Sequence, residues 1–264
     1  MLSKKIGGKI MSEIKYGLQL FSVREPLKED LEGTLKKVSE IGYEGVEFFG
    51  EAPASPETLK SLLNKYNLEC CGWHFWGDPL DLKDDKKLKE VINLNQTIDN
   101  KNIVVSSIPE EYRKSRKGWL EMALHFNAID KRLNQNNLNL GYHNHDFEFK
   151  NMEGETPWDI LFTKTNQDVI MQLDTGNAYK GGGKVVDILK KYSDRAKTIH
   201  LKPYSFDQET ENDDGFKTMI GEDDTPWTDI FEICEKSGVT EWYIVEYETD
   251  LYPPLEGVEK CLTK

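Results

Sequence analysis

Histidines, carboxylates and one lysine gather where short apolar runs of the sequence end. Residues two apart in a strand share a face, and three pairs in this group have that spacing, so the members of each pair would point the same way. Imidazole and carboxylate groups aimed at one point suit a divalent ion such as Mn, Co or Zn, or Mg with fewer histidines. The group comprises Glu47, His74, His143, His145, Asp174, His200, Lys202, Glu246 and Glu248.

Eight short runs rich in apolar and β-branched residues alternate with longer segments of helical period. This alternation predicts repeated strand and helix units and a parallel sheet. Several runs are apolar almost throughout, as strands covered on both faces are. We expect strands at 16–21, 45–49, 68–75, 102–107, 138–145, 169–174, 197–202 and 242–248.

Helix caps and stops punctuate the segments between these strands. The segment 30–41 has helical period and ends at Gly42, a usual C-terminal stop. Ser55 followed by Pro56 predicts the start of the next helix. Further helices are expected at 81–98 and at 119–133. Two more are expected to begin at the Thr-Pro-Trp runs at 156–158 and 225–227, each with a Thr cap and a first-turn proline.

Eight strand and helix pairs in about 250 residues are typical of a TIM barrel, so the predicted fold class is α/β, a single (β/α)8 barrel. We expect residues 16–264 to form the barrel and residues 1–15 to be a loose N-terminal tail. A doubly wound open sheet is the alternative, but residues 19–22 are not the glycine-rich phosphate turn that it needs. A TIM barrel concentrates its reactive groups at the C-terminal ends of its strands, which is where the candidate residues lie.

Composition and charge argue against several classes of protein. The chain has 264 residues, 38% of them hydrophobic, which is enough for a large core. Its formal net charge of −13 argues against nucleic acid as a partner. No run of about 18 apolar residues exists to cross a membrane, and the N-terminus lacks the apolar core of a secretory signal, so we expect a cytoplasmic protein.

Five strings of the sequence resemble the xylose isomerase-like TIM barrels of the sugar phosphate isomerase and epimerase superfamily. The strings are VEFFG, GYHNHDFEF, QLDTGN, IHLKP and IVEYE, and the likeness extends from Tyr16 to about Leu262. The resemblance implies a metal ion held at the ends of strands five to eight, usually by Glu, Asp, His and Glu. The matching positions here are His143, Asp174, His200 and Glu246.

Two departures from the family pattern bear on the chemistry. His143 stands where the family usually has its first glutamate, and Asn177 stands where a histidine often follows the strand-six aspartate. Ketose 3-epimerases of the superfamily use two metal-bound glutamates as acid and base on opposite faces of the sugar. The histidine therefore argues against a symmetric epimerase mechanism, unless Glu148 supplies the missing carboxylate as ligand or base.

The function expected first is a metal-dependent sugar isomerase or epimerase that removes a proton next to a carbonyl through an enediolate. Glu246 would be both ligand and proton-transfer group, and Lys202 would stabilise negative charge on oxygen. The second acid or base would be Glu148 or His145. Contacts with the substrate, through its hydroxyl groups or by stacking on its ring, are expected of Glu47, His74, Trp76 and Glu248.

A lyase or hydrolase is the alternative, because the same proton abstraction can end in elimination. The resemblance includes dehydratases of inososes and lyases or hydrolases of 3-keto-glycosides. An abasic-site endonuclease is disfavoured by the charge of −13, and a non-catalytic sugar-binding or partner-binding barrel would bind no metal. Apart from Lys202 no basic cluster follows strands seven and eight, which favours an unphosphorylated carbohydrate, and the sequence leaves a homo-oligomer open.

Overall fold

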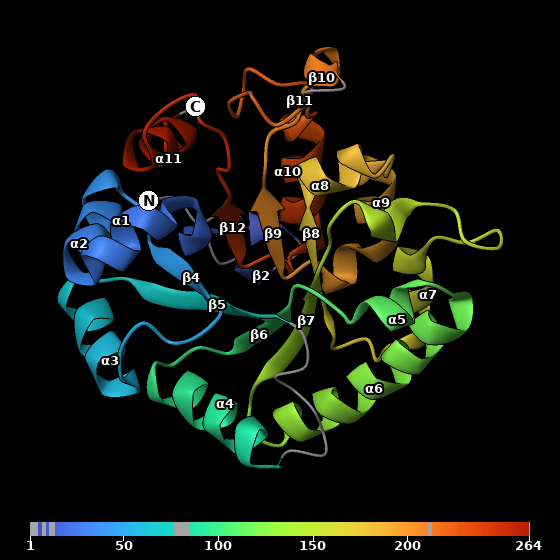
Figure 1. Ribbon diagram of the computed structural model, residues 1–264, viewed down its shortest axis with the longest axis horizontal. Coiled ribbons are helices and arrows are strands. Elements are labelled where there is room, and N and C mark those ends of the chain that lie inside the picture. The colour runs from blue at the N-terminus through green and yellow to red at the C-terminus, as the bar shows by residue number, and fades with distance from the viewer. Residues whose placement is uncertain (1–4, 7–8, 11–13, 77–84, 211–212, 264) are drawn as a thin grey trace.

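A computed structural model describes residues 5–6, 9–10, 14–76, 85–210 and 213–263 of the chain. Its parallel strands form a closed barrel in the order β12-β3-β4-β5-β6-β7-β8-β9, which confirms the predicted TIM barrel (Figure 1). All eight predicted strands are present, most of them one to three residues shorter than expected. Their bounds are β3 Lys15–Gln19, β4 Gly45–Phe49, β5 Glu69–Phe75, β6 Asn102–Val105, β7 Asn139–His143, β8 Ile170–Asp174, β9 Thr198–Leu201 and β12 Trp242–Val245.

Helices surround the barrel strands, and the predicted helical segments are helical here (Figure 1). The α-helices are α1 Arg24–Glu29, α2 Leu31–Ile41, α3 Pro56–Lys65, α4 Asp85–Thr97, α5 Glu110–Arg113, α6 Arg116–Asn134, α7 Pro157–Lys164, α8 Thr175–Lys180, α9 Val185–Tyr192, α10 Trp227–Ser237 and α11 Pro254–Leu262. Short 3-10 helices are η1 Leu20–Val23, η2 Phe147–Phe149, η3 Ser193–Arg195 and η4 Phe206–Gln208. Two hairpins pair β1 Lys5–Ile6 with β2 Lys9–Ile10, and β10 Glu209–Thr210 with β11 Asp213–Asp214.

Local sequence signals account for several helix ends. The Asp30 side chain accepts a hydrogen bond from the Gly33 amide at 2.9 Å and so caps α2. Gly42 ends the same helix with a φ of 115°, a left-handed conformation that glycine adopts without strain. The predicted caps at Ser55 and Thr156 also form, on α3 and α7.

The predicted cap at Thr225 is wrong. α10 begins after Pro226, and among the described residues the buried Thr225 hydroxyl has no hydrogen-bond partner. The Asp223 carboxylate organises this turn instead, because it accepts hydrogen bonds from the Thr225 amide at 3.3 Å and from Trp227 Nε1 at 2.8 Å. A neighbouring acceptor thus takes the place of the Thr cap.

The barrel strands turn apolar side chains outward and polar side chains inward at their C-terminal ends. Outward residues such as Leu18, Phe48 and Trp73 are buried in the main core between strands and helices. The inward polar side chains need space, and glycine provides it: a Cβ atom on Gly72 would lie 2.2 Å from Glu47 Oε1 on the paired strand. The strand alternation therefore separates a packed apolar layer from a polar interior.

Parts of two predictions lie outside the described residues. They are most of the expected tail, of which the structure describes β1, β2 and residues 14–15, and the first part, 81–84, of the helix expected at 81–98. Within the part of the chain that is described, no helix combines the length and the apolar character needed to cross a membrane.

Candidate metal centre

Four side chains with metal-binding atoms meet at the C-terminal ends of neighbouring strands. His143 ends β7, Asp174 ends β8 and His200 lies in β9. Glu246 directly follows β12. Each residue is buried and offers one ligand atom, and these atoms all lie within 4.8 Å of one another. The structure therefore brings together the four residues that the sequence predicted as ligands.

Among the described residues, one of the two Asp174 carboxylate oxygens has a hydrogen-bond partner and the other has none. Oδ1 caps α8 by accepting a hydrogen bond from the Asn177 amide at 2.7 Å. Oδ2 is buried and has no hydrogen-bond partner among the described residues. Burial raises the pKa of Asp174 to about 7, although Lys202 opposes the shift. A buried carboxylate oxygen without a partner is costly unless a cation or a donor meets it, so Oδ2 suits a metal ligand.

His200 lies between two carboxylates. Its Nδ1 is 2.6 Å from Glu246 Oε2, and its Nε2 is 2.6 Å from Glu47 Oε2. Nδ1 also lies 4.0 Å from Asp174 Oδ2. Burial alone would lower the pKa of His200, but Glu47 and Glu246 raise it to about 10. Because Nδ1 is the nitrogen near Glu246 and Asp174, it is the ring nitrogen that faces the four-residue cluster.

Lys202 forms a charged group with two glutamates beside the cluster. Its Nζ lies 3.2 Å from Glu246 Oε1 and also bonds the carboxylate of Glu248. Burial alone would lower the pKa of Lys202, but Glu246, Asp174 and Glu248 hold it above its usual range, so the side chain is an ammonium. This ammonium is fixed where it can stabilise negative charge on a nearby oxygen.

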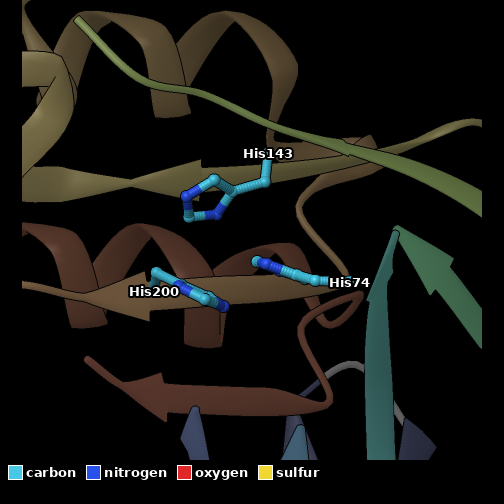
Figure 2. Close-up of side chains that lie close together, drawn as sticks. All are labelled: His74, His143 and His200. Carbon is cyan, nitrogen blue, oxygen red and sulfur yellow. The ribbon is translucent and has the colours of Figure 1, made fainter. Parts of the chain in front are cut away.

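Three imidazole rings converge in the interior, as Figure 2 shows for His74, His143 and His200. The rings of His74 and His200 are stacked with centroids 5.2 Å apart, and the His143 ring lies at a steep angle 4.6 Å from that of His200. Their nitrogens form a second group with metal-ligand spacing. The interior thus presents two overlapping sets of donor atoms, which share His143 and His200.

Gln172, in β8, is a site residue that the sequence analysis missed. Its side chain lies 2.6 Å from His74 Nε2 and 3.2 Å from His143 Nδ1. Its amide nitrogen donates to Glu47 Oε1 at 2.8 Å. Strand alternation could have found it, because Gln172 lies two residues before Asp174 and shares its face.

Glu47 is completely buried and its oxygens are occupied by protein groups. Besides the contacts with His200 and Gln172, it accepts a hydrogen bond from Gln19 Nε2 at 2.8 Å, and Gln19 is a second residue that the sequence analysis missed. Burial alone would raise the pKa of Glu47, but His74 and His200 hold it well below its usual range. The expected contact of Glu47 with substrate is therefore corrected: the residue does not line the cavity.

A cavity of about 550 Å³ opens over the cluster. Trp76, of which 53% is exposed, forms an aromatic wall with Phe21 and Phe49. Burial lowers the pKa of His145 to about 4, so its ring is neutral. Seven predicted site residues line the cavity: His74, Trp76, His143, His145, Lys202, Glu246 and Glu248. The other lining residues are Gln19, Phe21, Phe49, Ser106, Asn177, Lys180 and Phe216.

Glu148 does not reach this cavity, so the expectation that it supplies a ligand or base is corrected. It lies in η2 and is fully buried. One oxygen accepts a hydrogen bond from Tyr142 Oη at 2.6 Å and the other from the His145 amide at 2.9 Å. Burial raises the pKa of Glu148 to about 8. Its contacts assign it to the support of the loop that carries His145.

Substitution of Glu148 tests this supporting role. Glu148→Ala is expected to lower the free energy of unfolding by about 2–4 kcal/mol, because it leaves a cavity and two buried donors without an acceptor. Glu148→Gln keeps the volume and, with its amide facing Tyr142 Oη, one acceptor for the His145 amide. Urea unfolding measures the loss of stability in Glu148→Ala. Metal titration measures whether Glu148→Gln still binds metal. Loss of metal binding in a folded Glu148→Gln variant would show that the carboxylate acts at the cluster.

Comparison with known proteins places most of the barrel in a family. The family model described as the xylose isomerase-like TIM barrel matches residues 35–262. A curated relative, the inosose dehydratase of Clostridium botulinum (strain Alaska E43 / Type E3), is 26% identical over 259 residues, which cover 85% of this chain and 85% of the relative.

Two solved structures share the fold. A sugar phosphate isomerase/epimerase from Parabacteroides distasonis has a TM-score of 0.82 and 20% identity, over 96% of this chain and 95% of the other. The IOLI protein, solved with a binding zinc atom, has a TM-score of 0.70 and 12% identity, over 95% of this chain and 96% of the other. Since the family model covers most of the residues and the barrel is closed, this chain belongs to the xylose isomerase-like TIM barrel family.

Proposed function

We propose that the protein is a divalent-metal-dependent enzyme that removes a proton next to the carbonyl group of a polyhydroxylated ring ketone and eliminates water. The observation that carries this proposal is a buried set of two imidazoles and two carboxylates beside a fixed ammonium, under one cavity. The relationship to a protein named inosose dehydratase supports the reaction class.

The ion would be held by His143, Asp174, His200 and Glu246. These residues fit a divalent cation because Asp174 Oδ2 is buried with no hydrogen-bond partner among the described residues and because the donor atoms of all four residues lie within 4.8 Å of one another. Mixed nitrogen and oxygen donors suit Mn, Co or Zn, and the IOLI protein has zinc. When bound, such an ion polarises a carbonyl oxygen and stabilises the negative charge that develops on it.

The chain's own groups would carry the proton transfer. Glu246 and Glu248 are the carboxylates that line the cavity, so one of them takes the proton from the carbon next to the carbonyl. Lys202 holds its ammonium between them and stabilises negative charge on the substrate oxygen as the C–H bond breaks. The electron pair then forms a C=C bond while the C–O bond to the hydroxyl group on the neighbouring carbon breaks, and this hydroxyl leaves as water with the proton that the glutamate removed.

The one-sided arrangement of carboxylates favours elimination over epimerisation. Among the described residues, the carboxylates that line the cavity are Glu246 and Glu248, both just after β12. Inversion at one carbon needs an acid and a base on opposite faces, whereas elimination proceeds with one base. The imidazoles of His143 and His145 line the cavity as well, and Glu148 is turned away from it. This geometry changes the order of the two functions that the sequence suggested.

A sugar isomerase is the second candidate, because migration of a carbonyl to the neighbouring carbon also needs only one base. The fold shared with a protein named sugar phosphate isomerase/epimerase is consistent with this reaction. Both reactions use a small carbohydrate, for which Trp76 offers a stacking surface and His74 and His145 offer hydrogen bonds.

Removal of Asp174 tests the metal centre. Asp174→Ala is expected to abolish turnover and to weaken metal binding by more than the roughly 10- to 100-fold that loss of an outer-shell partner costs, because it removes a direct ligand. Metal content after dialysis and initial rates measure both effects. Asp168→Ala, which removes an exposed aspartate just before β8, is the matched control and is expected to change neither. A fully active Asp174→Ala variant would contradict the assignment.

The fate of the substrate separates the two reactions. The manganese-loaded protein is incubated in deuterated water with a panel of inososes, ketoses and 3-keto-glycosides, and the product masses are followed. A dehydratase is expected to give a product lighter by one water. A product that gains deuterium with its water content intact would favour the isomerase, and metal-loaded protein that changes no compound of the panel would contradict both.

A further inference from the structure

We propose that Gln172 and Glu47 are positioning residues that decide which nitrogen of His143 and which nitrogen of His200 faces the ion. The inference rests on the proposed metal centre and adds how the protonation of its two imidazole ligands is set. The evidence is a chain of hydrogen bonds in which each group's role as donor or acceptor follows from its neighbour.

The orientation of the Gln172 amide follows from Glu47. An ionised carboxylate only accepts hydrogen bonds, so the atom of Gln172 that lies 2.8 Å from Glu47 Oε1 is the NH2 group. The same NH2 group lies 3.1 Å from Thr198 Oγ1, whose hydroxyl can accept. The carbonyl oxygen of Gln172 must then face His143 and His74, at 3.2 and 2.6 Å.

The Gln172 oxygen in turn sets the tautomer of His143. A carbonyl oxygen only accepts, so His143 Nδ1 must carry the proton that it donates. In a neutral imidazole the other nitrogen, Nε2, then keeps its lone pair, and the lone pair is what a metal ion binds. Burial, together with the nearby His200 and His74, lowers the pKa of His143 well below its usual value, which agrees with a neutral ring.

Glu47 acts on His200 in the same way. Its Oε2 accepts from His200 Nε2 at 2.6 Å. His200 Nδ1 donates to Glu246 Oε2 at 2.6 Å and lies 4.0 Å from Asp174 Oδ2, so Nδ1 faces the four-residue cluster and the ion would take the place of its proton. Glu47 is itself held in place, because Gln19 donates to it through Nε2 while the Gln19 oxygen accepts from the Phe21 amide at 3.0 Å. One hydrogen-bond network therefore leaves different ring nitrogens of the two histidines to face the ion, Nε2 of His143 and Nδ1 of His200.

The same network decides what the three converging rings in Figure 2 do. His74 Nε2 donates to the Gln172 oxygen and lies 3.0 Å from Glu47 Oε2, so it carries a proton. The nitrogens of His143 and His200 that face this network carry protons as well. Gln172 or Glu47, neither of them a proposed ligand, accepts each of these three hydrogen bonds, so we expect the three histidines to form no second ion site and the chain to hold one ion.

The test uses the zinc-loaded full chain with 15N-labelled histidine, because nitrogen chemical shifts distinguish protonated from metal-bound ring nitrogens. The wild type is expected to bind one zinc per chain, with His143 bound through Nε2 and His200 through Nδ1. In Gln172→Leu, which removes the acceptor, the protonated Nδ1 signal of His143 is expected to disappear, and zinc affinity is expected to fall roughly 10- to 100-fold.

An exchange of the two side chains is the matched control. Gln172→Glu alone places two carboxylates next to each other. Glu47→Gln alone places two amides next to each other and removes the carboxylate acceptor. Each single variant is therefore expected to weaken zinc binding. The double variant Glu47→Gln/Gln172→Glu restores an amide that donates to a carboxylate and keeps the net charge. It is expected to recover zinc affinity and the His143 signal, whereas a role limited to packing predicts additive losses.

The outcomes separate this inference from the proposed function. Zinc bound through His143 Nδ1, two zinc ions per chain, or a double variant no better than the single ones would overturn the inference and leave the metal centre standing. Absence of zinc binding in the wild type would overturn the metal centre and the inference with it.

Discussion

Negative charge buried inside the closed barrel is the constraint on which the rest of the site depends. Glu47, Asp174 and Glu246 are buried there, and each buried carboxylate costs several kcal/mol unless charge or hydrogen bonds compensate for it. Lys202 and His200 supply part of the compensation, by contacts of 2.6–3.2 Å. Asp174 Oδ2 is left without a hydrogen-bond partner among the described residues, and we propose that a divalent cation meets it.

The fold determines where that charge can stand. Alternation along each strand sends apolar side chains outward to the helices, so the polar side chains of β7, β8 and β9 must share the interior. Asp174 ends its strand and caps α8 with the same carboxylate, which fixes the direction of the free oxygen. Glycine at position 72 leaves the volume that the Glu47 side chain occupies. The described part of the site therefore depends on strand ends and on one small residue.

The barrel and the four-residue cluster could be predicted from sequence because both follow from periodicity. An apolar run has a strand period, and the side chains at its end share the mouth of the barrel whatever their separation in sequence. Glu148 could not be placed this way, because it lies in a 3-10 turn after β7, where alternation no longer sets the direction of a side chain. Gln172 was missed for another reason: it begins the QLDTGN string and shares a strand face with Asp174, but an amide is neither a titratable group nor a common metal ligand, and its role follows from its contacts with Glu47 and His143.

Anomalous diffraction from crystals of the manganese-loaded protein tests the metal centre most directly. One strong anomalous peak is expected within about 2.0–2.3 Å of donor atoms from His143, Asp174, His200 and Glu246. The Lys202 ammonium is expected to stay beside Glu246 and outside the coordination sphere. A peak at another place in the fold, or none at saturating manganese, would contradict a metal-dependent function for this barrel.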